Sequence, residues 1–212
     1  MDLPEEYKKG YKDFLNAKID LSKRPLIPRD ETSYWVEIVI NEIKKENKEF
    51  HCLDLFSGSG CVGISILKNI NNCFCDFGEI NDDFIEQIKI NLGINGVNGK
   101  IIKTDVFSNI DSSYDYILAN PPYVADERWE EVGEDVKMFE PKLALLGGTR
   151  GMNLIRRFLK EAKTFLKDNG KIFMELDEDQ MNDIEEIVKD KYSSYQFFKD
   201  QFGKYRFIRI EK

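Results

Sequence analysis

The stretch Asn120-Pro121-Pro122-Tyr123 contains the residue types in this chain that are best suited to chemistry. An amide nitrogen is a weak nucleophile, so it needs acceptors that bind its N–H bonds and hold it in line with an electrophile. The Asn120 side-chain oxygen and the Pro121 carbonyl can supply these acceptors, and the two prolines stiffen the backbone. Tyr123 can pack against a planar group. The stretch therefore indicates methyl transfer to a planar nitrogen, a displacement that depends on positioning and requires no strong base.

A glycine-rich segment lies upstream of this stretch. Gly58, Gly60 and Gly63 form a G-x-G-x-x-G pattern between an expected strand and an expected helix, which is the context that such a pattern requires. The backbone can approach a ligand closely there, and the helix N-terminus offers free N–H groups. Glu79 follows at the end of the next expected strand, where a carboxylate accepts hydrogen bonds from ribose hydroxyls. A tight turn without a ligand is the alternative interpretation.

Two aspartates favour S-adenosylmethionine over a nicotinamide cofactor. Asp54 precedes the glycines and suits a cationic sulfonium and an α-amino group. Asp105 follows the third expected strand and can accept a hydrogen bond from an adenine amino group, with Val106 and Phe107 flanking the ring. An exposed loop aspartate is the alternative for Asp105. An NAD oxidoreductase would need a proton donor near the nicotinamide, and none is evident.

These residues must be positioned by the elements around them. Seven segments have the apolar pattern of strands: 50–55, 73–79, 100–104, 114–119, 171–176, 194–199 and 205–210. Helices are expected from Asp30, as a cap, to Ile43 and over 60–70, 82–93, 150–167 and 178–190. The alternation predicts an α/β fold with a doubly wound, mostly parallel seven-stranded sheet. A short loop containing Gly203 joins the last two strands and predicts an antiparallel hairpin.

The N-terminal residues look different from the rest. Residues 3–17 have apolar positions on one helical face, and 18–28 read as an extended connector because of Pro25 and Pro28. We therefore expect a short N-terminal helix and connector over 1–29 and a single methyltransferase domain over 30–212.

The amino-acid composition indicates which class of partner the protein binds. The net charge of −8 and the sequence pI near 4.9 count against nucleic acid and favour a protein partner. The chain has no long apolar run and no apolar segment at its N-terminus, so we expect no membrane association and a cytoplasmic location. The single histidine and the four cysteines, which form no Cys-x-x-Cys pair, offer no ligand set for a metal. We expect the cysteines to be free thiols.

With these motifs in view, most of residues 24–180 resembles the release-factor glutamine methyltransferase family. The matching segments are Leu26 to Thr32, Asp54 to Cys61, Asn120 to Tyr123, Glu140-Pro141, Ala144 to Gly148, Gly151 and Glu175. The Ile-Pro-Arg-Asp-Glu-Thr part of the first segment separates this family from DNA adenine methyltransferases that share the Asn-Pro-Pro-Tyr loop.

The resemblance implies a Rossmann-like class I methyltransferase that uses S-adenosylmethionine to methylate N5 of the glutamine in the Gly-Gly-Gln motif of peptide chain release factors. Substrate contacts are implied at Asn120, Pro121, Pro122 and Tyr123. With the aspartates above, the expected cofactor contacts are Asp54, Phe56, Ser57, Gly58, Ser59, Gly60, Glu79, Ile80, Asp105, Val106 and Asn120. Family members usually carry a helical N-terminal domain that helps to grip the release factor, and a small activator subunit is a further candidate partner.

Two other functions stay open. An amino methyltransferase acting on adenine or cytosine of DNA or RNA would use the same loop, together with a flipped base and a positive channel. A non-catalytic scaffold could keep the fold without binding the cofactor. The simplest interpretation of the charged residues 127–135 is a solvated loop or short helix. Because this segment follows Tyr123 closely, a lid over the substrate is the alternative.

Overall fold

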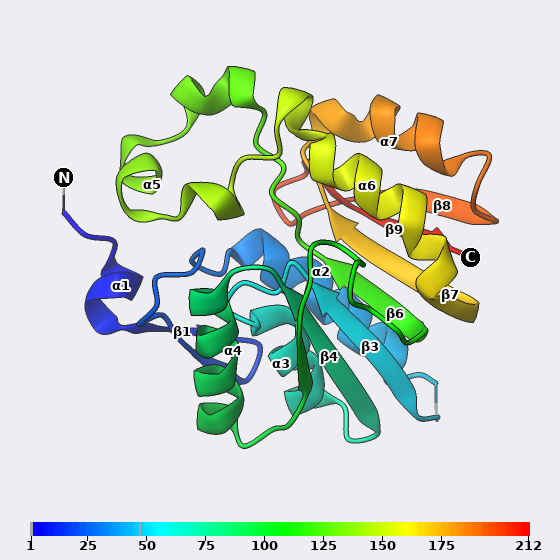
Figure 1. Ribbon diagram of the computed structural model, residues 1–212, viewed down its shortest axis with the longest axis horizontal. Helices are drawn as coiled ribbons and strands as arrows, with labels where there is room; N and C mark the ends of the chain where they lie inside the picture. The colour runs from blue at the N-terminus through cyan, green and yellow to red at the C-terminus, as the bar shows by residue number, and fades with distance from the viewer. Residues whose placement is uncertain (1, 47) are drawn as a thin grey trace.

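The computed structural model describes residues 2–46 and 48–212, and a seven-stranded sheet organises it (Figure 1). The strands lie in the spatial order β5 (Lys100–Lys103), β4 (Cys73–Glu79), β3 (Phe50–Leu55), β6 (Tyr114–Ala119), β7 (Leu166–Glu175), β9 (Tyr205–Glu211) and β8 (Ser194–Lys199). The first five strands are parallel, whereas β9 runs antiparallel to both β7 and β8. The predicted doubly wound sheet with its C-terminal hairpin is therefore confirmed.

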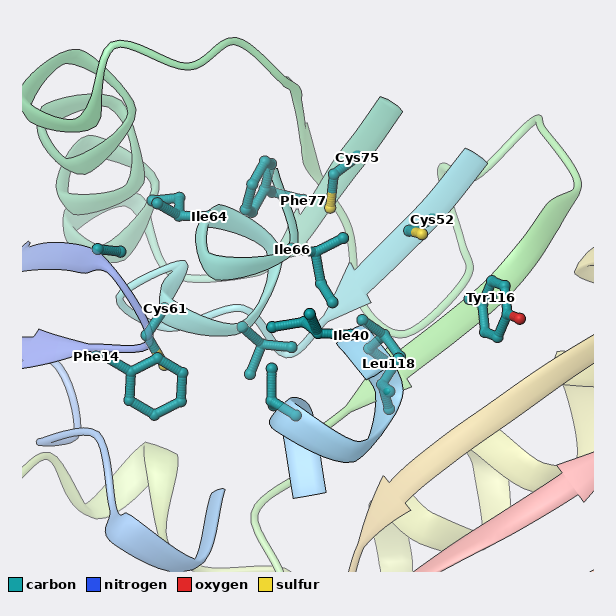
Figure 2. Packing of buried hydrophobic residues seen from close by; sticks show 14 of the residues in the cluster. Phe14, Ile40, Cys52, Cys61, Ile64, Ile66, Cys75, Phe77, Tyr116 and Leu118 are labelled. Carbon is teal, nitrogen blue, oxygen red and sulfur yellow. The ribbon is translucent and has the colours of Figure 1, made fainter. Parts of the chain in front are cut away.

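Helices cover both faces of the sheet because successive strand residues point to opposite sides. The helices α2 (Asp30–Ile43), α3 (Cys61–Asn69) and α4 (Asp82–Asn95) pack on one face. The helices α6 (Asn153–Glu161) and α7 (Met181–Val188) pack on the other. Strand β3 shows the division, since Cys52 belongs to the first buried cluster and Leu53 to the second. Figure 2 shows residues of the first cluster, among them Cys61, Ile64 and Ile66 of α3.

The N-terminal segment differs from the expected helix over 3–17. Helix α1 spans only Glu5–Lys9 and ends at Gly10 (φ 79°), and an antiparallel hairpin follows, with β1 (Tyr11–Phe14) and β2 (Ala17–Asp20). Leu15 and Asn16 join these strands, both at positive φ, which is the backbone of a two-residue hairpin turn. Phe14 reaches the same core as Cys61 of α3 (Figure 2). Burial against that core outweighs the weak helical periodicity.

Two further boundaries differ from the sequence expectation. The helix expected over 150–167 is a 3₁₀ turn at Thr149–Gly151, then α6, then a second 3₁₀ turn at Ala162–Phe165. Strand β7 already begins at Leu166, which pairs with Tyr114 of β6, so Asn169-Gly170 form an irregularity inside the strand instead of a helix stop. The helix expected over 178–190 is a 3₁₀ turn at Glu178–Gln180 followed by α7.

A long excursion connects β6 to α6. It contains the 3₁₀ helix η1 (Asp126–Glu131), the helix α5 (Glu134–Phe139) and the 3₁₀ turn η2 (Lys142–Ala144), and it extends away from the sheet (Figure 1). It returns where Val124 bridges Leu146. Among the residues described, no helix combines the length and apolarity needed to cross a bilayer. The four cysteines are free thiols, three of them buried.

Candidate active site

The topological switch point of the sheet lies between β3 and β6, because the chain runs from β3 outward to β5 and then returns to the other side of β3. Leu55 pairs with Ala119, so the residues that follow, Phe56 and Asn120, leave neighbouring strands at the same edge. Ligands bind at this position in doubly wound sheets. The glycine loop and the Asn-Pro-Pro-Tyr loop are therefore neighbours.

A pocket of about 160 Å³ opens at this edge. Most of the predicted cofactor residues line it: Asp54, Phe56, Ser57, Gly58, Ser59, Glu79, Ile80, Asp105, Val106 and Asn120, joined by Pro122. Gly60 does not line the pocket but starts α3 in a left-handed conformation (φ 78°). Tyr123 instead lines a second hollow of about 410 Å³.

Glu79 is held at the end of β4 by three backbone N–H groups. Its Oε2 accepts from Gly58 at 2.8 Å, and its Oε1 accepts from Ile80 and Asn81 at 2.9 Å each. Burial raises the pKa of Glu79, and the three hydrogen bonds oppose this shift. The carboxylate thus ties the glycine loop to β4 and keeps lone pairs for a pair of hydroxyls.

Asp54 is an almost fully buried carboxyl in the pocket wall, with 2% of its surface exposed. Its Oδ2 accepts from the Gly63 N–H at 2.9 Å. Desolvation raises the pKa of Asp54 to about 8; repulsion from Glu79 adds to the shift, and the Gly63 hydrogen bond opposes it. A buried acid of this kind is stabilised in its ionised form by a cation, which suits a positively charged ligand.

Backbone strain marks the same edge of the sheet. Phe56 and Val106 have left-handed conformations, with φ values of 62° and 54°. A β-branched residue rarely adopts this region, and such positions cluster at ligand sites. Gly63 has a different requirement, because an added Cβ would lie 2.5 Å from the Phe77 ring and 2.7 Å from the Cys75 sulfur. The third glycine therefore permits close packing of α3 on β4.

The adenine-side residues agree with the prediction only in part. Asp105 lines the pocket, and its Oδ1 accepts from Arg157 Nη1 at 3.0 Å. Val106 lines the pocket as expected. Phe107, however, is buried in the core, stacked on Phe165 with ring centroids 4.5 Å apart. The expectation that Phe107 flanks a bound ring is wrong.

A buried hydrogen-bond network lies behind Asn120, and sequence reasoning assigned it no role. Glu175, at the end of β7, is 2% exposed and accepts from three side chains. Thr32 and Trp35 of α2 donate to Oε2 at 2.7 and 2.9 Å, and Tyr123 donates to Oε1 at 3.0 Å. Asn120 Nδ2 donates to Thr32 Oγ1 at 3.4 Å. The sequence indicated only that Thr32 and Glu175 belong to the segments that resemble the methyltransferase family.

The far end of the loop is held by Gln180, which sequence reasoning missed. Its Nε2 donates to the Tyr123 carbonyl at 2.9 Å and to the Gly151 carbonyl at 3.1 Å. On the pocket side, the Glu140 carboxylate pairs with the Arg29 guanidinium and accepts from the Ile27 N–H at 3.0 Å. The Glu140 contacts thus fix the excursion after Tyr123 to the segment before α2.

The second hollow carries mixed charge. Its lining includes four acidic and two basic side chains: Glu127, Glu131, Asp177, Asp179, Arg128 and Arg150. The carboxylates thus outnumber the guanidinium groups. The predicted charged segment 127–135 contributes to this wall, next to Tyr123.

Comparisons with known proteins agree with this geometry. Residues 30–138 match the methyltransferase small domain family. The chain is 31% identical to the release factor glutamine methyltransferase of Lactococcus lactis over 98% of its own length and 77% of that protein. It is 31% identical to the protein of the same name from Streptococcus pneumoniae over 98% and 75% of the two lengths.

Solved structures support the fold. A ribosomal protein L11 methylase from Lactobacillus delbrueckii has a TM-score of 0.63 at 17% identity, covering 91% of this chain and 82% of that one. A 16S rRNA methyltransferase from T. thermophilus, in complex with AdoMet and guanosine, has a TM-score of 0.69 at 16% identity, covering 95% and 49%. The predicted class I methyltransferase fold is confirmed.

Proposed function

Because the chain belongs to the release factor glutamine methyltransferase family, we propose that it methylates N5 of the glutamine in the Gly-Gly-Gln motif of a peptide chain release factor, with S-adenosylmethionine as methyl donor. The observation that carries the proposal is the adjacency of Asn120 to the pocket of Asp54 and Glu79 at one edge of the sheet. This adjacency supports a reaction between a group held by the loop and a ligand held by the pocket.

The pocket residues fit the proposed cofactor. Bound S-adenosylmethionine supplies a methyl group on a positively charged sulfur. Asp54, with its raised pKa, favours a cation beside it, and Glu79 presents lone pairs suited to ribose hydroxyls. The nucleoside and amino-acid parts of the cofactor would be surrounded by Phe56, Ser57, Gly58, Ser59, Gly60 and Ile80. Asp105 and Val106 would lie beside the adenine base.

The Asn-Pro-Pro-Tyr loop would bind the glutamine. The Asn120 Oδ1 and the Pro121 carbonyl would accept hydrogen bonds from the two N–H groups of the glutamine amide and fix its plane. The nitrogen lone pair then faces the pocket. Pro122 and Tyr123 limit the space around the amide. The methyl–sulfur bond of S-adenosylmethionine would break as the N–CH₃ bond forms, and S-adenosylhomocysteine would be the leaving group. The methylated nitrogen would then lose one proton to water, so the site needs no strong base.

The release factor would lie over the second hollow. The excess of acidic side chains in this hollow suits a basic segment of the release factor beside the glutamine. Residues 127–135 would contact the release factor there. We expect residues 30–212 to form the catalytic domain and 1–29 to brace it through the α1 to β2 segment. A small activator subunit and a cytoplasmic location stay part of the proposal.

Transfer of isotope-labelled methyl from S-adenosylmethionine tests this function. We expect label in a release factor with an intact Gly-Gly-Gln motif and none when that glutamine is replaced by alanine. Asn120→Ala should lower kcat by at least about 100-fold, the scale for losing one oriented polar group at a reacting centre. Label in added DNA or RNA instead would favour the amino methyltransferase alternative, and failure to bind the cofactor would favour a scaffold.

A further inference from the structure

We infer that Thr32 and Glu175 are positioning residues that set which way round the Asn120 side-chain amide lies. Asn120 has an oxygen and an NH₂ group at the two ends of a planar amide, and only the oxygen can accept a hydrogen bond from a substrate amide. The inference rests on the proposed role of Asn120 and adds the residues that make that role possible.

Trp35 fixes the first direction in this network, because its indole Nε1 can only donate. It lies 2.9 Å from Glu175 Oε2, so that oxygen accepts. The Thr32 hydroxyl lies 2.7 Å from the same oxygen, and Tyr123 donates to Oε1 at 3.0 Å. Burial raises the pKa of Glu175, whereas the hydrogen bonds from Trp35, Thr32 and Tyr123 and the nearby Arg206 charge oppose this shift. In its ionised form, the Glu175 carboxylate accepts on both oxygens. The single Thr32 hydroxyl hydrogen is therefore directed at Glu175.

Once Thr32 has donated its hydrogen, only lone pairs remain on Oγ1. The Asn120 atom at 3.4 Å from Oγ1 must then be the NH₂ nitrogen, because an oxygen there would face another oxygen with no hydrogen between them. The Asn120 Oδ1 is left as the atom available to a ligand in the pocket that Asn120 lines.

The three elements involved meet only in the folded protein. Thr32 comes from α2, Asn120 from the loop after β6, and Glu175 from the end of β7. Thr32 and Glu175 are 1% and 2% exposed, so water does not compete for their hydrogen bonds. A reversed Asn120 amide would oppose NH₂ to NH₂ and remove one of the two proposed acceptors.

Neutron diffraction from deuterium-exchanged crystals containing S-adenosylhomocysteine tests the inference without measuring activity. We expect the Thr32 deuteron on the line to Glu175 Oε2 and the ND₂ group of Asn120 toward Thr32. Deuterons on the Asn120 atom that faces away from Thr32 would overturn the inference. This result is decisive even if the release factor proves not to be the substrate, because it concerns the protein alone.

A matched pair of variants tests the consequence for turnover. Thr32→Val keeps the shape but removes the hydroxyl, whereas Thr32→Ser keeps it. With the release factor as substrate, we expect kcat of Thr32→Val to fall at least about tenfold. Thr32 also lines the pocket, and the dissociation constant of S-adenosylhomocysteine, measured by calorimetry, should change by a smaller factor than kcat. Thr32→Ser should recover most of that loss. Equal kcat in Thr32→Val and Thr32→Ser would contradict a positioning role of the Thr32 hydroxyl.

Substitutions of Glu175 give an independent comparison if Thr32→Val does not fold. The oxygen of Glu175→Gln can accept from Thr32 and Trp35 while its NH₂ donates to Tyr123, so this variant should turn over at least about fivefold faster than Glu175→Leu. Equal rates in the two would overturn the inference. Wild-type protein that transfers no methyl to the release factor would instead show that the proposed function is wrong.

Discussion

Tyr123, the last residue of the Asn-Pro-Pro-Tyr loop, donates a 3.0 Å hydrogen bond to Glu175 at the end of β7. The contact joins the loop to the strand beside it in the sheet, and burial together with the nearby Glu175 charge raises the pKa of Tyr123. The tyrosine is thus a neutral donor throughout the physiological range. Tyr123 also lines the second hollow, so it has both a structural and a proposed substrate-packing role.

Replacing Tyr123 by phenylalanine separates these two roles. The ring stays, but Oε1 of a buried carboxylate loses its donor, which should lower the free energy of unfolding by about 1–3 kcal/mol. We expect only a modest change in KM for the release factor, because the packing surface is retained. Urea unfolding and steady-state kinetics measure the two effects. Unchanged stability would show that Glu175 does not need this hydrogen bond.

Gly63→Ala tests the packing of α3 on β4. The new methyl group would lie 2.5 Å from Phe77 and 2.7 Å from Cys75, closer than any relaxed contact. We expect the free energy of unfolding to fall by about 1–3 kcal/mol. Gly93→Ala in α4 is the matched control, because nothing lies within 4 Å of its added Cβ. That change should stabilise the protein by about 0.5–1 kcal/mol, since alanine favours helices. Thermal unfolding of the two variants should therefore show opposite signs.

Asp54→Asn should stabilise the protein without cofactor while weakening cofactor binding. The pKa of Asp54 is about 8 when folded, above its ordinary value of 3.8, so the folded state keeps a proton that the unfolded chain has released. Its contribution to stability is therefore full below about pH 4 and is lost as the pH rises through about 8. Asparagine removes this loss and can still accept from Gly63.

Urea unfolding at pH 5 and pH 8 checks this expectation. The gain of Asp54→Asn over the wild type should be larger at pH 8, by more than about 1 kcal/mol. Calorimetry should show at least about tenfold weaker S-adenosylmethionine binding by the variant, because the ionised acid no longer faces the cation. A variant that binds the cofactor as tightly as the wild type would remove Asp54 from the proposed site.

The sheet and most of the pocket could be predicted because their signals are local. Apolar segments set β3, β4 and β6, and the glycines follow one of these strands directly. Parallel strands bring their carboxyl ends to one edge of the sheet. The strand pattern alone therefore predicts that Glu79 and Asn120 line the same pocket. The N-terminal hairpin was missed because Leu15-Asn16 carries no glycine, and the long-range burial of Phe14 determines its structure.

The network behind the loop could not be predicted from local patterns. Thr32 and Glu175 are separated by 143 positions, and Asn120 lies 88 positions from Thr32. Nothing in their own segments shows that a threonine, a tryptophan and a tyrosine share one carboxylate. Phe107 illustrates the opposite error, since its place after Asp105 suggested a ligand contact, whereas stacking against Phe165 buries it.

The most direct test of the account is a crystal structure of the complex with S-adenosylhomocysteine and a peptide containing Gly-Gly-Gln. We expect the sulfur beside Asp54, the ribose on Glu79 and the glutamine NH₂ group between Asn120 Oδ1 and the Pro121 carbonyl, with its nitrogen facing the sulfur. A cofactor product bound away from the glycine loop, or a glutamine amide that does not reach Asn120, would contradict it.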